Sequence, residues 1–129
     1  MAKGWSKSPV AFIKVVESDL VDKRKEITAT ALQAVVSGSP VDTGAYKANH
    51  RVTLDGVDLG YDLDAKDPSG SQALADGEAV IGQIDTPFGE SVIQNNLPYS
   101  ETLELGHSQQ APQGTYGPAF VAVQEKYTK

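Results

Sequence analysis

Apolar residues follow a helical period over one long stretch, from Pro9 to Val36, which contains no internal Gly or Pro. Ser8 and Pro9 favour a helix start, because Ser caps free N–H groups and Pro fits the first helical turn. The apolar residues form a stripe along one helical face: Phe12, Ile13, Val16, Leu20, Ile27, Ala31, Ala34 and Val35. The sequence therefore predicts one continuous helix over residues 9–36, about 42 Å long.

This helix is expected to end at Ser37-Gly38-Ser39-Pro40, since Gly accepts a left-handed conformation and Pro cannot continue a helix. Its apolar stripe has two interpretations. In the first, the helix belongs to the core of its own domain. In the second, part of the stripe also packs on another subunit, because the helix is long for a small domain. The charged middle, Asp22 to Glu26, is expected to face solvent.

Further along the chain, apolar and polar residues alternate with a period of two, which is typical of strands. Strands are predicted over Asn49 to Leu54, Glu78 to Ile84 and Ser91 to Asn96. Residues Val57 to Leu63 also alternate, against Asp and Gly. They are interpreted either as a further strand or as an irregular excursion.

The remaining segments are short. Asp67-Pro68 is expected to cap a helix that runs to Asp76, and Gly106 to stop a helix over Pro98 to Leu105. Pro118 to Tyr127 is expected to form the last helix, after a loop at residues 107–117.

These elements predict an α+β fold in which a long N-terminal helix packs on a small antiparallel sheet of three to five strands. We expect a flexible arm at residues 1–8 and a single domain over 9–129. Within it, the sheet and loops occupy residues 47–96, and short helices occupy residues 98–127.

The amino-acid composition limits the classes of function that this chain can have. With 129 residues and a hydrophobic share of 40%, the chain has the size of one domain with a modest core. A net charge of −6 disfavours broad binding to nucleic-acid phosphates, which depends on Lys and Arg. The chain has no cysteine, which excludes disulfides and Cys-based zinc sites. No apolar run reaches the ~20 residues of a membrane span, so we expect a soluble protein made in a cytoplasm.

The tripeptide Asp42-Thr43-Gly44 matches the short signature of aspartic proteases. That chemistry requires a second Asp that shares a proton with the first, and the chain holds one such tripeptide. A protease of this kind remains an alternative. The favoured interpretation is a turn in which the Asp42 side chain caps nearby N–H groups and Gly44 takes a positive φ.

Other candidate sites are weak. Five aspartates crowd residues 55–67, but Lys66 and Asp67 break the spacing of a calcium loop. Glu101, Glu104 and His107 have helical spacing without a further metal ligand. His50 is expected to be packed or exposed rather than catalytic. The residues themselves thus predict no catalytic, cofactor or metal site.

Two segments carry a resemblance. The first is Pro40-Val41-Asp42-Thr43-Gly44, directly after the long helix, and the second is Asn95 to His107, with the sequence NNLPYSETLELGH. This order resembles the small tail-component proteins of long-tailed bacteriophages, known as tail-completion, neck or phage morphogenesis proteins. In that family a long helix leads to a P-V-D-T-G turn, and an N-x-x-P-Y-A-x-x-L-E-x-G segment follows later. Ser100 stands where Ala is usual.

The resemblance implies a structural virion protein, assembled in the host cytoplasm, that completes the tail or neck by joining neighbouring rings at the head–tail junction. It implies no enzyme activity, no cofactor and no membrane. The implied partners are further copies in a homomeric ring, which we expect to be sixfold, and the adjacent neck and tail proteins. DNA would pass through the lumen without sequence-specific binding. A tail terminator that caps the tail tube is the alternative. Below it come an aspartic-protease-like enzyme that uses Asp42-Thr43-Gly44 and then a host-directed binding protein.

The second motif also supplies a candidate interface between subunits or between rings, because its short helix ends in Gly and carries an aromatic residue suited to an interface centre. Its members are Tyr99, Glu101, Glu104, Gly106 and His107. The alternative is that Tyr99 only closes the core of its own subunit.

Overall fold

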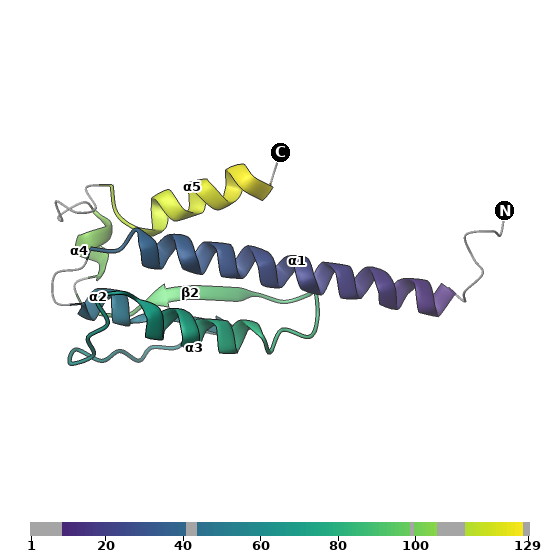
Figure 1. Ribbon diagram of the computed structural model, residues 1–129, viewed down its shortest axis with the longest axis horizontal. Helices are drawn as coiled ribbons and strands as arrows, with labels where there is room; N and C mark the ends of the chain where they lie inside the picture. Colours follow the sequence, from purple (N-terminus) through teal and green to yellow (C-terminus); the bar gives the residue numbers. More distant parts are fainter. Residues whose placement is uncertain (1–8, 41–43, 99, 106–112, 128–129) are drawn as a thin grey trace.

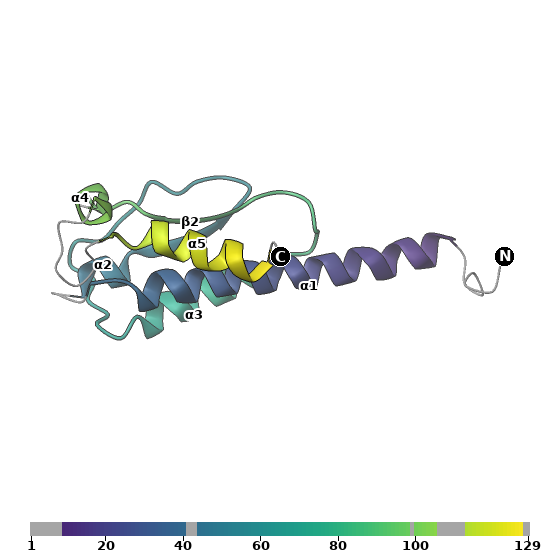
Figure 2. The same cartoon turned by 90° about the horizontal axis from the view of Figure 1, so that it is seen from above.

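The computed structural model describes residues 9–40, 44–98, 100–105 and 113–127. Helix α1, Pro9–Ser37, is continuous, which confirms the predicted long helix (Figure 1). In both views its N-terminal part extends past every other labelled element (Figures 1 and 2). The predicted arm at residues 1–8 lies outside the described residues.

The other elements follow α1 in a short α+β arrangement, which confirms the predicted fold class: α2 Ala45–Ala48, β1 His50–Leu54, α3 Ser71–Ile81, β2 Ser91–Asn95, α4 Ser100–Glu104 and α5 Tyr116–Tyr127. β1 and β2 pair antiparallel, with Val52 opposite Ile93. α1 packs against α3, α5 and both strands. In Figure 1, α5 lies along one side of α1, while β2 and α3 lie along the other.

The predicted sheet of three to five strands is wrong, because the described part of the chain forms a sheet of two strands. The predicted strand at Glu78 to Ile84 falls largely within α3. Ala73, Gly77 and Ile81 are spaced four apart and all are buried, so helical rather than alternating spacing fits this segment.

Asp67 caps α3 as predicted, although the helix begins later and runs further. Its Oδ2 atom accepts the backbone N–H groups of Gln72 at 2.9 Å and Ala73 at 3.0 Å. Gly77 lets the helix approach α1 closely, because an added Cβ would lie 2.4 Å from Cδ2 of Leu32. Helix α3 therefore takes the place beside α1 that a third strand was expected to fill.

The core combines α1, β1 and α3 in one cluster: Leu32, Val36, Val52, Ala73, Ile81 and Ile84. Leu32 and Val36 are the large apolar residues most deeply buried in α1, and neither belongs to the predicted stripe. Leu20, which does, is 48% exposed. The predicted stripe is thus confirmed at Val35, which is buried, while Leu32 and Val36 extend the buried face beyond it and Leu20 remains on the surface.

Candidate functional site

The segment that connects β1 to α3 in the sequence carries a row of exposed apolar side chains. This is the segment predicted to be either a strand or an irregular excursion. We call this row of side chains the apolar strip: Val57, Leu59, Tyr61 and Leu63. The segment is irregular, and the four side chains are between 46% and 81% exposed. Asp58, which alternates with them, is half-buried and pairs with Arg51 at 3.0 Å. The apolar side chains of this segment are therefore on the surface, while Asp58 makes the contact with β1.

Asn49 fixes the C-terminal half of the apolar strip. Its side chain is almost fully buried, and its Oδ1 accepts the N–H of Asp62 at 2.7 Å while its Nδ2 donates to the Asp62 carbonyl at 2.8 Å. Nδ2 also donates to the carbonyl of Ala45 at 2.7 Å. The amide therefore pairs with the backbone of Asp62 as a neighbouring strand would.

Two further amides fix the N-terminal half. Gln94 donates to the carbonyl of Asp58 and accepts its N–H, and Asn96 donates to the carbonyls of Asp58 and Gly60. Hydrogen bonds from the Gly60 N–H and from Arg51 hold the pKa of the Asp58 carboxyl below its ordinary value. Because both halves of the backbone are held, the apolar side chains are presented to solvent in a defined arrangement.

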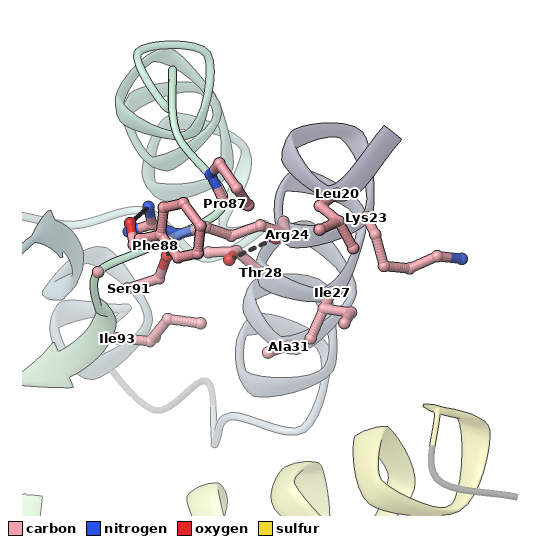
Figure 3. A pocket seen from close by; sticks show the side chains of 11 residues that line it. Leu20, Lys23, Arg24, Ile27, Thr28, Ala31, Pro87, Phe88, Ser91 and Ile93 are labelled. Carbon is pink, nitrogen blue, oxygen red and sulfur yellow. Dashed lines mark hydrogen bonds between the residues drawn. The ribbon is translucent and has the colours of Figure 1, made fainter. Parts of the chain in front are cut away.

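A groove lies on a different surface, between the middle of α1 and the chain that enters β2 (Figure 3). It has a volume of about 460 Å³. Its apolar walls come from Leu20, Ile27 and Ala31 on α1, and from Phe88 and Ile93 opposite. Leu20 and Phe88 are both exposed. Apolar residues of the predicted stripe thus line a concave surface instead of the core.

Arg24 crosses the floor of the groove and departs from the expectation that the charged middle of α1 faces solvent, whereas Asp22, Lys23 and Glu26 are exposed as expected. Its Nε donates to Oγ of Ser91 at 3.1 Å, and its Nη1 donates to the carbonyls of Thr86 at 3.0 Å and Phe88 at 2.7 Å. Its Nη2 is buried without a hydrogen-bond partner among the described residues. Within the described residues no carboxylate pairs with Arg24, so its positive charge lies in the lining of the groove, while the unpaired Nη2 donor is enclosed by the protein.

His50 is packed, one of the two outcomes expected for it. The Ser39 hydroxyl donates to the Val35 carbonyl at 2.6 Å, so the His50 Nε2–H must donate to that hydroxyl, also at 2.6 Å. Nδ1 of His50 then accepts from the Tyr116 hydroxyl at 2.8 Å. Burial and the nearby charge of Lys47 lower the pKa of His50 to about 3. The neutral ring ties α1, β1 and α5 together, and the Ser39 proton points away from it.

Of the candidate interface, the structure describes the side chain of Glu104. Its carboxylate accepts the N–H groups of Thr115, Tyr116 and Gly117 at 2.8–2.9 Å. Burial alone would raise the pKa of Glu104, but these three bonds outweigh it and lower the pKa. Glu104 therefore caps the start of α5 within its own subunit. Tyr99, Gly106, His107 and the side chain of Glu101 lie outside the described residues.

Of the motif turn, the structure describes Pro40 and Gly44. Pro40 is buried. Gly44 has φ +81°, and an added Cβ would lie 3.0 Å from the backbone N atoms of Asp67 and Pro68. Its carbonyl accepts the N–H of Asp67 at 3.2 Å, so the turn joins the region after α1 to the start of α3. Val41, Asp42 and Thr43 lie outside the described residues.

Sequence reasoning missed the residues that build both surfaces. Asn49 falls at the start of a predicted strand, and nothing in the pattern marks Gln94, Asn96 or Arg24 as binding residues. The nearest signal was three amides, Gln94-Asn95-Asn96, at the end of one strand.

Across the described ranges, His, Asp and Glu side chains form no group of three that could hold a metal ion. Among the described helices, none has the length and apolarity needed to span a bilayer. Comparison with family models, with curated proteins and with solved structures finds no match for this chain.

Proposed function

We propose that this chain is a structural subunit of the head–tail junction of a long-tailed bacteriophage, where a homomeric ring of copies completes the tail or neck. The observation that carries the proposal is the pairing of a long helix with two apolar surfaces left uncovered. Large exposed apolar surfaces on a soluble chain mark sites of protein association. The apolar strip and the groove lie on different parts of the chain, as a ring of identical subunits requires.

Three further features support the proposal. The N-terminal part of α1, which projects past the other elements, has the apolar sequence Pro9-Val10-Ala11-Phe12-Ile13. Gly44 and Pro40 belong to the turn that resembles the tail-component family, and their structural roles suit a framework protein. A net charge of −6 suits a subunit around a lumen, because acidic walls let DNA pass without adhering.

The test is a phage stock in which the gene for this chain carries an early stop codon. We expect DNA-filled heads and finished tails that fail to join, and purified chain added to the lysate should restore infectious particles. Quantitative mass spectrometry of restored particles should give several copies per particle, and images should place them at the junction. Normal joining without the chain, or a single copy per particle, would overturn the proposal.

A further inference from the structure

The apolar strip and the groove have complementary surfaces: both are apolar, and they carry opposite charges. The strip is flanked by acidic residues, among which Asp64 is exposed and its carboxylate makes no hydrogen bond or ion pair within the described residues. The groove is apolar at its walls and carries the positive charge of Arg24 at its floor. An apolar row with acidic edges thus matches an apolar cleft with a basic floor.

From this match we infer that the groove of one subunit binds the apolar strip of a second copy of the same chain. Leu59, 81% exposed at the middle of the strip, enters between Leu20 and Phe88 of its neighbour. An acidic residue at the edge of the strip, such as Asp64, then lies near the positive charges of Lys23 and Arg24, which both line the groove. The inference deepens the proposed function and rests on it, because it names the contact between neighbours in the ring.

The geometry of the contact explains why it generates a ring. Two different patches meet, so each copy still offers a free strip on one side and a free groove on the other. A contact of this heterologous kind continues from copy to copy until the rotation closes. Because the amides of Asn49, Gln94 and Asn96 already hold the strip, little ordering entropy opposes binding.

The test uses cysteine cross-linking, which the absence of native cysteine makes specific. Leu59→Cys and Leu20→Cys are made as separate single variants, because both side chains are exposed and tolerate replacement. The two proteins are mixed at the highest soluble concentration and treated with a short bismaleimide. We expect a covalent dimer in the mixture at a yield at least tenfold above that of either variant alone.

The matched control is Phe120→Cys, at an exposed apolar position on α5 that belongs to neither surface. Mixed with Leu20→Cys, it should give background yield only. Salt should weaken the specific cross-link, because part of the attraction is between charges. A chain that carries both Leu20→Cys and Leu59→Cys should give a ladder of products that stops at one fixed size.

Three results would overturn the inference: no dimer in the mixture, a dimer from Leu59→Cys alone, or capture by Phe120→Cys as efficient as by Leu59→Cys. The proposed function and this contact can fail independently of each other. If the chain maps to the junction but this cross-link does not form, the ring uses another contact. If the cross-link forms but heads and tails join without the chain, the contact stands and the proposed function fails.

Discussion

Strand β1 and the apolar strip have the same alternating pattern but differ in burial. In β1, Val52 faces the core and Arg51 faces outward. In the strip, Leu59 is exposed, and Asp58 is half-buried and pairs with Arg51 on the surface. β1 has a neighbouring strand for its backbone, whereas the strip has the side-chain amides of residues 49, 94 and 96. A period of two therefore predicts an extended chain, but packing against other elements decides whether its apolar face is buried.

The largest expected effect comes from placing a charge on each segment in turn. Val52→Asp should destabilise the fold by roughly 4 kcal/mol or more, since it buries an unpaired carboxylate in the core. Leu59→Asp should change stability by no more than about 0.5 kcal/mol, since the side chain is already in solvent. Urea unfolding of the two variants measures both. Equal losses would mean that the strip is packed like β1.

A smaller effect is expected from removing the amide that holds the strip. Asn49→Ala should cost about 2 kcal/mol, because the buried carbonyl of Ala45 loses its donor and Asp62 loses its backbone partner. Hydrogen exchange at the Asp62 amide should accelerate as well. Gln33→Ala, which removes an exposed amide from α1, is the control and should change neither quantity. Unchanged exchange at Asp62 in Asn49→Ala would show that the strip is held by other contacts.

The third expected effect is a loss of folding stability in acid, caused by His50 at the start of β1. The folded pKa of His50 is about 3, against about 6.5 unfolded, so the unfolded chain binds the extra proton between these values. Stability should be highest above pH 6.5 and should fall by roughly 1 kcal/mol per pH unit as the pH drops through this window. His50→Gln should give a flatter pH profile. A wild-type profile no steeper than that of His50→Gln would contradict a buried neutral His50.

The sequence predicted the elements whose signals are local. Uninterrupted helical spacing from Pro9 and the break at Gly38 defined α1, and alternation around Val52 and Ile93 defined both strands. The strand predicted at residues 78–84 is wrong because it rests on Val80 and Ile81 alone. Ala73 and Gly77 lie earlier in the same segment, and their four-residue spacing places them on one helical face.

The residues that build the apolar strip and the groove could not be predicted from the local sequence, for a different reason. Arg24 reaches carbonyls more than sixty residues away, and Asn96 binds backbone groups of residues 58 and 60. Such pairings depend on how the elements pack, and a charged or amide residue in the sequence carries no sign of them. The resemblance to tail-component proteins rests on turn and helix residues and does not extend to either surface.

We expect the free chain to hold the apolar strip in one conformation, ready for a partner. Nitrogen-15 relaxation of the backbone amides tests it most directly, with β1 as the internal reference. The account predicts order parameters near 0.85 for Leu59, Tyr61 and Leu63, equal to those of rigid backbone. Values below about 0.6 at these positions, with β1 rigid, would contradict it, because the strip would then be a flexible loop.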